Sequence, residues 1–233
     1  MTAVFGHRGC TEGFVENTVD AFAEARRLGA DGVELDVRLT ADGALAIHHD
    51  ASIPGVGVIA ELAVGDLPAQ VPLLADVLAV CDGMVVNVEI KNAPQDPGWD
   101  PTEAVASLVA SSIGAAGWTE RVIVSSFQPA TLRAVQVADG RLALGALWGW
   151  GVEVGPALEE AAGAGFRAVH PFVTSVDAEL VEGAHAAGLA VNVWTVNAVE
   201  DLRAMVAVGT DAVITDRVGD ALAVVAEVEP GRR

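Results

Sequence analysis

The chain has 233 residues, of which 52% are hydrophobic, and this is enough apolar sequence to bury a substantial core. Its formal net charge of −19 disfavours nucleic acid and anionic membrane surfaces as partners. We find no apolar run near the ~20 residues needed to cross a bilayer, so no stable membrane insertion is expected.

The cellular location follows from the N-terminal segment and the cysteines. The N-terminus has no basic stretch ahead of a long apolar run, so it is not typical of a secretory signal. Cys10 and Cys81 lie far apart without metal-ligand spacing, which indicates reduced thiols. We therefore expect a cytoplasmic protein.

Short β-rich runs alternate along the chain with stretches rich in alanine, glutamate and leucine. Most of the short runs are continuously apolar, which is typical of strands covered on both faces. The predicted strands are Val4–His7, Gly32–Arg38, Met84–Lys91, Arg121–Phe127, Arg141–Trp148, Ala168–His170, Ala190–Thr195 and Ala212–Thr215. The predicted helices are Thr18–Leu28, Leu73–Val80, Pro101–Ala115, Pro129–Ala138, Pro156–Ala164, Ala178–Ala187, Val199–Val208 and Gly219–Val228.

Residues at the predicted helix ends support this division. Pro101 and Pro129 stand where a first helical turn would begin, and proline is favoured there. Asp177 and Asn197 precede later helices and are expected to act as N-caps.

One segment departs from the alternation of strands and helices. Asp42-Gly43 lies between two extended runs and predicts a hairpin turn into a short strand over Ala44–His49. Ala51–Val71 and Asn92–Asp100 contain proline and glycine and are expected to be loops.

Eight strand–helix units in this length predict an α/β fold, the (β/α)₈ TIM barrel. The hairpin is then a short extension after the second strand, and no large inserted cap is expected. Residues 1–229 are predicted to form a single domain and residues 230–233 a loose tail. A doubly wound open sheet is the alternative, but chemically active residue types follow many strands rather than one switch point.

Carboxylates cluster late in two predicted strands. Active sites of such barrels lie at the C-terminal ends of the strands, and side chains two apart share a face. Glu34 and Asp36 can therefore converge, and so can Glu89 and Lys91. Three carboxylates suit Mg²⁺ or Ca²⁺, and the lack of a cysteine among them disfavours structural zinc. The structural alternatives are solvated charges on the second strand and a Glu89–Lys91 ion pair.

His7 and His49 are the acid–base candidates, because imidazole titrates nearest neutral pH. Each could instead be a structural histidine. His48 should point away from His49 by strand alternation, although a one-residue shift would exchange the two. Arg8 offers a bidentate fork to phosphate, and Lys91 offers a point charge.

Other residues have both a functional and a structural interpretation. Asn17 and Thr18 fit a helix N-cap, and Asn17 also fits a support of the loop after the first strand. Trp99, Trp148, Trp150 and Trp194 fall at or after strand ends, where they would form an apolar wall or ordinary loop packing. His170 ends the sixth strand and is ambiguous. Cys10 lies near His7, but no activating dyad for a cysteine nucleophile is evident.

These motifs, in this order, resemble the glycerophosphodiester phosphodiesterase family. The matching stretches are His7–Gly9, Glu16–Thr18, Ala21-Phe22, Gly29–Val37, Thr40 with Asp42-Gly43, His49-Asp50, Pro72–Leu74, Val88–Lys91, Val124–Phe127, Val193–Asn197 and Gly209–Asp216. The resemblance covers nearly the whole chain.

The resemblance implies metal-dependent hydrolysis of a glycerophosphodiester to sn-glycerol 3-phosphate, or a related phosphomonoester, and an alcohol. It implies one divalent ion, Mg²⁺ or Ca²⁺, and a small-molecule phosphodiester substrate. The implied roles are metal ligation by Glu34, Asp36 and Glu89, acid–base catalysis by His7 and His49, phosphate contacts from Arg8 and Lys91, and an alcohol-pocket contact from Trp194.

The chain departs from the family pattern after His49-Asp50. Ala51–Val71 is short and lacks the Leu-x-Arg-Thr-Thr run usual in the inserted segment that caps the site. The departure leaves the barrel chemistry intact and suggests a more open site that could accept a bulkier phosphodiester.

Three other functions fit the residues. A lyase-type phosphodiesterase acting on a lysophospholipid or inositol phospholipid would release a cyclic phosphate. A non-catalytic phosphodiester-binding barrel would bind without turnover, and an unrelated metal-dependent barrel enzyme would act on a carboxylate. Product analysis in a metal-dependent screen of phosphodiesters separates these alternatives.

Overall fold

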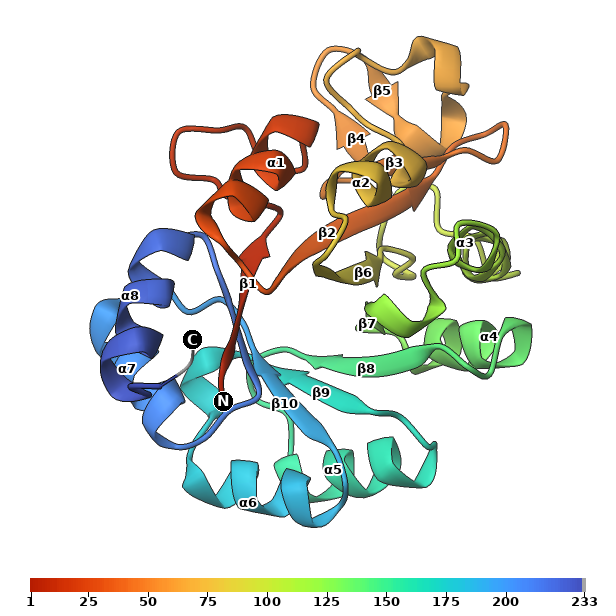
Figure 1. The fold of residues 1–233 in the computed structure, drawn as a ribbon. Helices are drawn as coiled ribbons and strands as arrows, with labels where there is room; N and C mark the ends of the chain where they lie inside the picture. The colour runs from red at the N-terminus through yellow and green to blue at the C-terminus, as the bar shows by residue number, and fades with distance from the viewer. Residues whose placement is uncertain (232–233) are drawn as a thin grey trace.

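A computed structural model describes residues 1–231, and within them eight parallel strands form a closed barrel (Figure 1). The strands follow the order β1-β11-β10-β9-β8-β7-β6-β2, and pairing of β1 with β2 closes the ring. They are β1 (Ala3–His7), β2 (Gly32–Leu39), β6 (Val85–Ile90), β7 (Val122–Ser126), β8 (Ala143–Trp148), β9 (Ala168–Pro171), β10 (Ala190–Val193) and β11 (Ala212–Thr215). The predicted TIM barrel is confirmed, and the open sheet is excluded.

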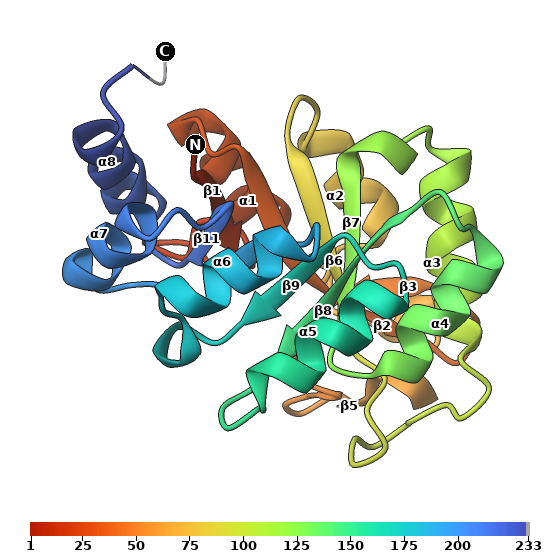
Figure 2. The ribbon, with the colours of Figure 1, turned by 90° about the horizontal axis from the view of Figure 1, so that it is seen from below.

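The helices lie outside the strands and cover the barrel (Figure 2). Those of the described residues are α1 (Val19–Leu28), α2 (Leu74–Val80), α3 (Ala104–Ala115), α4 (Pro129–Ala138), α5 (Val154–Gly163), α6 (Ala178–Ala186), α7 (Val199–Ala207) and α8 (Val218–Val228). Their buried faces supply large side chains such as Phe22 and Leu132 to one core cluster between strands and helices. None of these helices is long and apolar enough to span a bilayer.

Helix capping agrees with the sequence at some positions. The Thr18 side chain accepts a hydrogen bond from the Ala21 backbone N–H, and Asp177 accepts one from Leu180. Pro129 is the first residue of α4, as predicted. These caps satisfy backbone groups that a helix end otherwise leaves without partners.

Two helix starts differ from prediction. Pro101 does not begin α3, because the Asp100 carboxylate accepts hydrogen bonds from Thr102 and Ala104 and holds residues 100–103 as a turn. Asn197 is not the N-cap of α7, since its side chain pairs with residues at the end of β11 instead.

The hairpin extension is confirmed and is shorter than predicted. β3 (Leu45–Ile47) pairs antiparallel with the end of β2. The prediction that Ala51–Val71 is a loop is wrong in part. This segment contains the two-stranded sheet of β4 (Ser52–Ile53) and β5 (Gly57–Val58), followed by two short 3₁₀ helices. It lies beside β3 (Figure 1), where Ile53 and Ile59 pack on Ala46.

The middle of the barrel interior holds a buried histidine. His170 is fully buried, and its Nε2 lies 3.1 Å from the Asn192 side-chain nitrogen. A Cβ atom at Gly145 would lie 2.4 Å from the same Nε2, so glycine leaves room for the imidazole. Burial lowers the pKa of His170 to about 3, and the ring is therefore neutral. His170 is thus an interior residue of the barrel.

The two ends of the described chain contact each other. Glu229 accepts a hydrogen bond from the Thr2 backbone N–H, so the end of α8 contacts the start of β1. Part of the tail predicted for residues 230–233 lies outside the described residues, and the domain limits stay predictions.

Cys10 and Cys81 are free and buried, and the cytoplasmic location also stays a prediction.

Candidate active site

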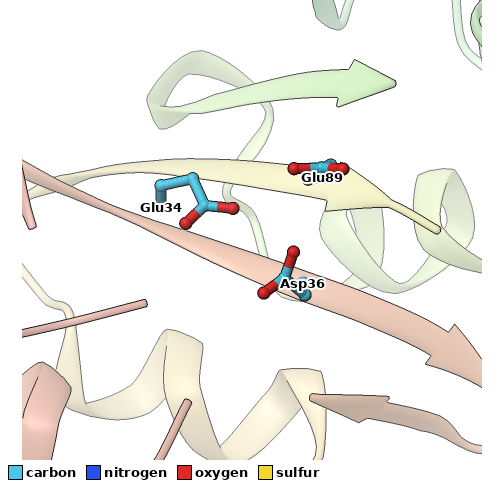
Figure 3. Close-up of side chains that lie close together, drawn as sticks. All are labelled: Glu34, Asp36 and Glu89. Atoms are coloured by element: carbon cyan, nitrogen blue, oxygen red, sulfur yellow. The ribbon is translucent and has the colours of Figure 1, made fainter. Parts of the chain in front are cut away.

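Three buried carboxylates meet at the C-terminal end of the barrel (Figure 3). Glu34 and Asp36 share one face of β2, and Glu89 is in register with Asp36 on the adjacent β6. One oxygen from each lies within 4.8 Å of the others, and the residues are 3%, 1% and 7% exposed. The strand alternation therefore brings together the three residues that the sequence suggested as metal ligands.

Two cations face this acidic cluster. Lys91 Nζ lies 3.1 Å from Asp36 Oδ1 and 2.5 Å from Glu89 Oε1. Arg8 Nε lies 3.2 Å from Asp36 Oδ2. Three carboxylates thus face two cations, and a negative charge is left over when all five groups are ionised. The Glu89–Lys91 ion pair exists, and it belongs to the cluster.

The cluster fits a divalent metal ion. Burial, followed by the nearby Asp36 charge, raises the pKa of Glu34 to about 8. Burial opposes ionisation of Asp36 as well, but Lys91 and Arg8 outweigh it and lower the pKa of Asp36. Asp36 Oδ1 and Glu89 Oε1 are buried, and among the described residues their polar contact is the ion pair with Lys91. A dication would offset the mutual repulsion, and oxygen ligands are those that Mg²⁺ and Ca²⁺ prefer.

The loop after β1 is shaped to hold Arg8 over the cluster. Arg8 has a left-handed backbone (φ 56°), and its N–H donates to Glu34 Oε2 at 3.0 Å. Gly9 follows with φ 89°, and a Cβ there would lie 2.7 Å from the Ala21 backbone. Only glycine allows this close approach to α1. The His-Arg-Gly motif is therefore a turn that directs a backbone donor and a guanidinium toward the carboxylates.

His7 is held by a carboxylate that sequence reasoning did not assign. Its Nδ1 lies 2.8 Å from Asp216 Oδ1. Asn197 fixes the other Asp216 oxygen at 2.6 Å and accepts the Asp216 N–H at 2.9 Å. Burial opposes protonation, but Asp216 and Glu34 outweigh it and raise the pKa of His7. Asp216 follows β11 directly, and its position at a strand end was the available signal.

His49 follows the short strand β3 and has a different environment from His7. Burial lowers the pKa of His49, although the Asp36 charge partly opposes this shift. Its Nδ1 contacts Asp50 at 2.8 Å, and its backbone carbonyl accepts a hydrogen bond from Arg38 Nε at 2.8 Å. Arg38 also pairs with Asp96 at 3.1 Å, which ties His49 to the loop after β6. His48 turns its Nδ1 to the Asp50 backbone oxygen.

Asn17 also belongs to the site. Its side-chain nitrogen donates to Asp36 Oδ2 at 2.8 Å, and the residue is buried with a left-handed backbone (φ 57°). Thr18 takes the N-cap role, which frees Asn17 for this contact. Glu16 accepts a hydrogen bond from Arg8 at 2.8 Å. The Glu-Asn-Thr motif therefore orients both Asp36 and Arg8.

Aromatic side chains border the site beyond Lys91. The Trp194 Nε1–H donates to the His170 carbonyl at 2.8 Å, and its ring meets Phe127 and Phe172 edge-on at 5.5 and 5.3 Å between centroids. Lys91 Nζ lies 5.9 Å from the Phe127 ring centre. Among the other tryptophans expected on this face, Trp148 is buried at the end of β8, while Trp99 and Trp150 are exposed.

The fold and this site define a TIM barrel with an acidic, histidine-flanked centre, and comparison with known proteins identifies its family. Residues 7–220 match the model of the glycerophosphoryl diester phosphodiesterase family. The chain belongs to this family of phosphoric diester hydrolases. It is 33% identical to a glycerophosphodiester phosphodiesterase of Caldanaerobacter subterraneus, over 92% of this chain and 94% of that protein. A Bacillus altitudinis glycerophosphodiester phosphodiesterase is 30% identical, over 93% and 95%.

Solved structures agree on the fold. A glycerophosphodiester phosphodiesterase from Thermotoga maritima superimposes with a TM-score of 0.81 at 25% identity, covering 96% of this chain and 98% of that one. An Oleispira antarctica phosphodiesterase, solved with the product sn-glycerol-3-phosphate, has a TM-score of 0.83 at 22% identity and covers 97% of both chains. The family resemblance predicted from the sequence is confirmed.

Proposed function

We propose that this chain is a metal-dependent phosphodiesterase that hydrolyses a glycerophosphodiester to sn-glycerol 3-phosphate, or a related phosphomonoester, and an alcohol. One observation carries the proposal: a buried three-carboxylate cluster lies beside two cations at one end of the barrel, with His7 in register with Glu34 and His49 within range of the Asp36 charge. The product complex of the Oleispira antarctica phosphodiesterase supports the substrate class.

Glu34, Asp36 and Glu89 would hold the metal ion, for which we propose Mg²⁺ or Ca²⁺. When bound, such an ion supplies positive charge that stabilises the phosphoryl oxygens as negative charge develops. Asn17 keeps the Asp36 carboxylate oriented through its 2.8 Å hydrogen bond. This support matters because ligands act best when a neighbouring hydrogen bond fixes them.

Arg8 and Lys91 bind the phosphoryl group in this proposal. Both cations lie at the rim of the acidic cluster. The guanidinium can present two parallel N–H donors to phosphate, and the ammonium acts as a point charge. Trp194 lines the side on which the alcohol part of the substrate lies.

His7 and His49 move the protons. One imidazole accepts the proton of the attacking water, and the other donates a proton to the leaving alkoxide. Asp216 holds His7 through Nδ1, so the Nε2 atom of His7 is the one left to exchange a proton with substrate. Arg38 holds the backbone of His49. Each histidine thus has a separate support.

The test uses enzyme stripped with EDTA, reloaded with Mg²⁺ or Ca²⁺, and assayed on glycerophosphodiesters with different head groups. Turnover should require the metal and yield the phosphomonoester. His7→Ala and His49→Ala should each lower kcat by about 10²–10⁴-fold. His48→Ala is the matched control and should keep wild-type turnover, because its imidazole contacts the Asp50 backbone oxygen, whereas His49 interacts with the charge of Asp36.

Circular dichroism on each variant separates loss of chemistry from loss of fold. Near-normal turnover in folded His7→Ala or His49→Ala would refute the two-histidine mechanism. A stable cyclic phosphate as the final product would replace hydrolysis by a lyase reaction. Binding of the diester without any turnover would reduce the protein to a binding barrel.

A further inference from the structure

A mostly apolar cavity of about 310 Å³ lies between the end of β8 and helices α4 and α5. Leu147 and Leu132 are among its apolar lining residues, and Val152 lines it from the loop between β8 and α5. The charged side chain in its lining is Glu160, which is exposed and pairs with Arg133 at 3.8 Å. The volume is at the lower end of small-molecule pockets, which span about 300–1,000 Å³.

The cavity and the candidate active site share a neighbour, Phe127. Phe127 lines the cavity, and its ring centre lies 5.9 Å from Lys91 Nζ and 5.5 Å from the Trp194 ring. The Phe127 ring therefore borders both the apolar space and the cation that we propose to bind phosphate. A chain attached to a phosphoryl oxygen near Lys91 would reach the cavity along this ring.

The loop beside the cavity exposes apolar surface that the fold does not use. Trp150 is 85% exposed, and Val152 is 38% exposed. The loop follows β8, so it lies at the same end of the barrel as the acidic cluster. Large apolar side chains exposed beside a cavity indicate a surface that meets an apolar ligand.

We propose that this cavity binds the hydrocarbon part of the substrate's alcohol. The inference rests on the proposed phosphodiesterase function and narrows its substrate class to glycerophosphodiesters with an alkyl or similarly apolar alcohol. The phosphate stays at Arg8 and Lys91, the first carbons of the alcohol cross Phe127, and later carbons enter the space between α4 and α5. The lining is mostly apolar, and the carboxylate that a charged head group would meet there, Glu160, already pairs with Arg133.

The experiment measures kcat/KM for a series of glycerophospho-n-alkanols, from methyl to octyl, with the metal-loaded enzyme. Alcohol chains that end at Phe127 should have a kcat/KM little above that of the methyl ester. Each further methylene that enters the cavity should raise kcat/KM about fourfold, which corresponds to ~0.8 kcal/mol per buried CH₂. The rise should stop once the cavity is full.

Two variants and one control locate the chain-length effect in the cavity. Ala157→Phe fills the cavity from α5 and should abolish the chain-length dependence while leaving the methyl ester at the wild-type rate. Val152→Asp places a carboxylate in the lining and should weaken the long esters selectively. Val137→Phe adds the same ring on the exposed side of α4, 89% exposed, and should change nothing.

The outcomes separate this inference from the function on which it rests. Equal kcat/KM along the series, or an unchanged slope in Ala157→Phe, would overturn the cavity assignment while hydrolysis itself stands. Failure of the wild-type enzyme to hydrolyse any ester, the methyl ester included, would instead overturn the proposed function. A slope that Ala157→Phe removes and Val137→Phe preserves would establish the cavity as the binding site.

Discussion

The buried histidine inside the barrel makes stability depend on pH in a way that can be calculated. Burial lowers the pKa of His170 from 6.5 to about 3, so the folded protein keeps the imidazole neutral throughout that range. The unfolded chain protonates the same imidazole as the pH falls below 6.5. At this residue the unfolded state therefore binds more protons, and the contribution of His170 to the free energy of unfolding must decrease as the pH is lowered through this window.

The size of the effect follows from the two pKa values. The full contribution is present above 6.5 and is lost progressively down to the folded pKa of about 3. Each pH unit inside the window costs about 1.4 kcal/mol. Between pH 7 and pH 5, His170 should therefore remove about 2 kcal/mol from the free energy of unfolding.

Urea unfolding of wild type and His170→Gln at pH 7 and pH 5 isolates the contribution of His170 to the free energy of unfolding. Glutamine is neutral in both states, so the variant should lose about 2 kcal/mol less than wild type between pH 7 and pH 5, whatever its stability at neutral pH. His185→Gln, which removes an exposed histidine paired with Asp211, controls for the loss of one imidazole. Equal losses in wild type and His170→Gln would refute the assignment of His170 as a buried neutral group.

Three further predictions concern single residues. Asp216→Asn removes the charge that favours protonated His7, so the His7 limb of the pH–rate profile should move to lower pH and kcat should fall at least about tenfold. Arg38→Gln breaks the hydrogen bond to the His49 carbonyl and should lower kcat about tenfold, but should cost nothing further in a His49→Ala background. Burial raises the pKa of Cys81 to about 12, so this thiol should react with a disulfide reagent at neutral pH only after unfolding.

The acidic cluster was predictable because it follows from local periodicity. Glu34 and Asp36 are two residues apart on one strand, Glu89 is on the next, and Lys91 directly follows the end of that strand. A strand places such pairs on one face, and a barrel brings the C-terminal ends of adjacent strands together. No long-range information beyond the fold class was needed to place these four side chains at one site.

The residues that hold the two histidines in place could not be predicted from local periodicity. Asp216 meets His7 across 209 positions of sequence, and no spacing rule links the two residues. Asn197 sits where an N-cap would sit, and the same side-chain chemistry serves a cap or a carboxylate partner. Arg38 has no local signal for its contact with His49.

The strands of the inserted segment were missed for a different reason. β4 and β5 contain two residues each, which is too short for strand alternation to be visible in the sequence.

The charges of the site explain how an acidic chain can bind an anionic substrate. Arg8 and Lys91 are engaged by Asp36 and Glu89, so without a metal ion they have little positive charge to offer to phosphate. If these carboxylates held a dication, as we propose, Arg8 and Lys91 would be less strongly engaged by them and more available to the phosphoryl oxygens. Binding of sn-glycerol 3-phosphate, measured by calorimetry on the stripped and reloaded protein, should therefore depend on the metal. In Asp36→Asn, which removes the one carboxylate charge that contacts both cations, some binding should return without metal. Equal affinity of the stripped and reloaded wild-type protein would contradict this coupling.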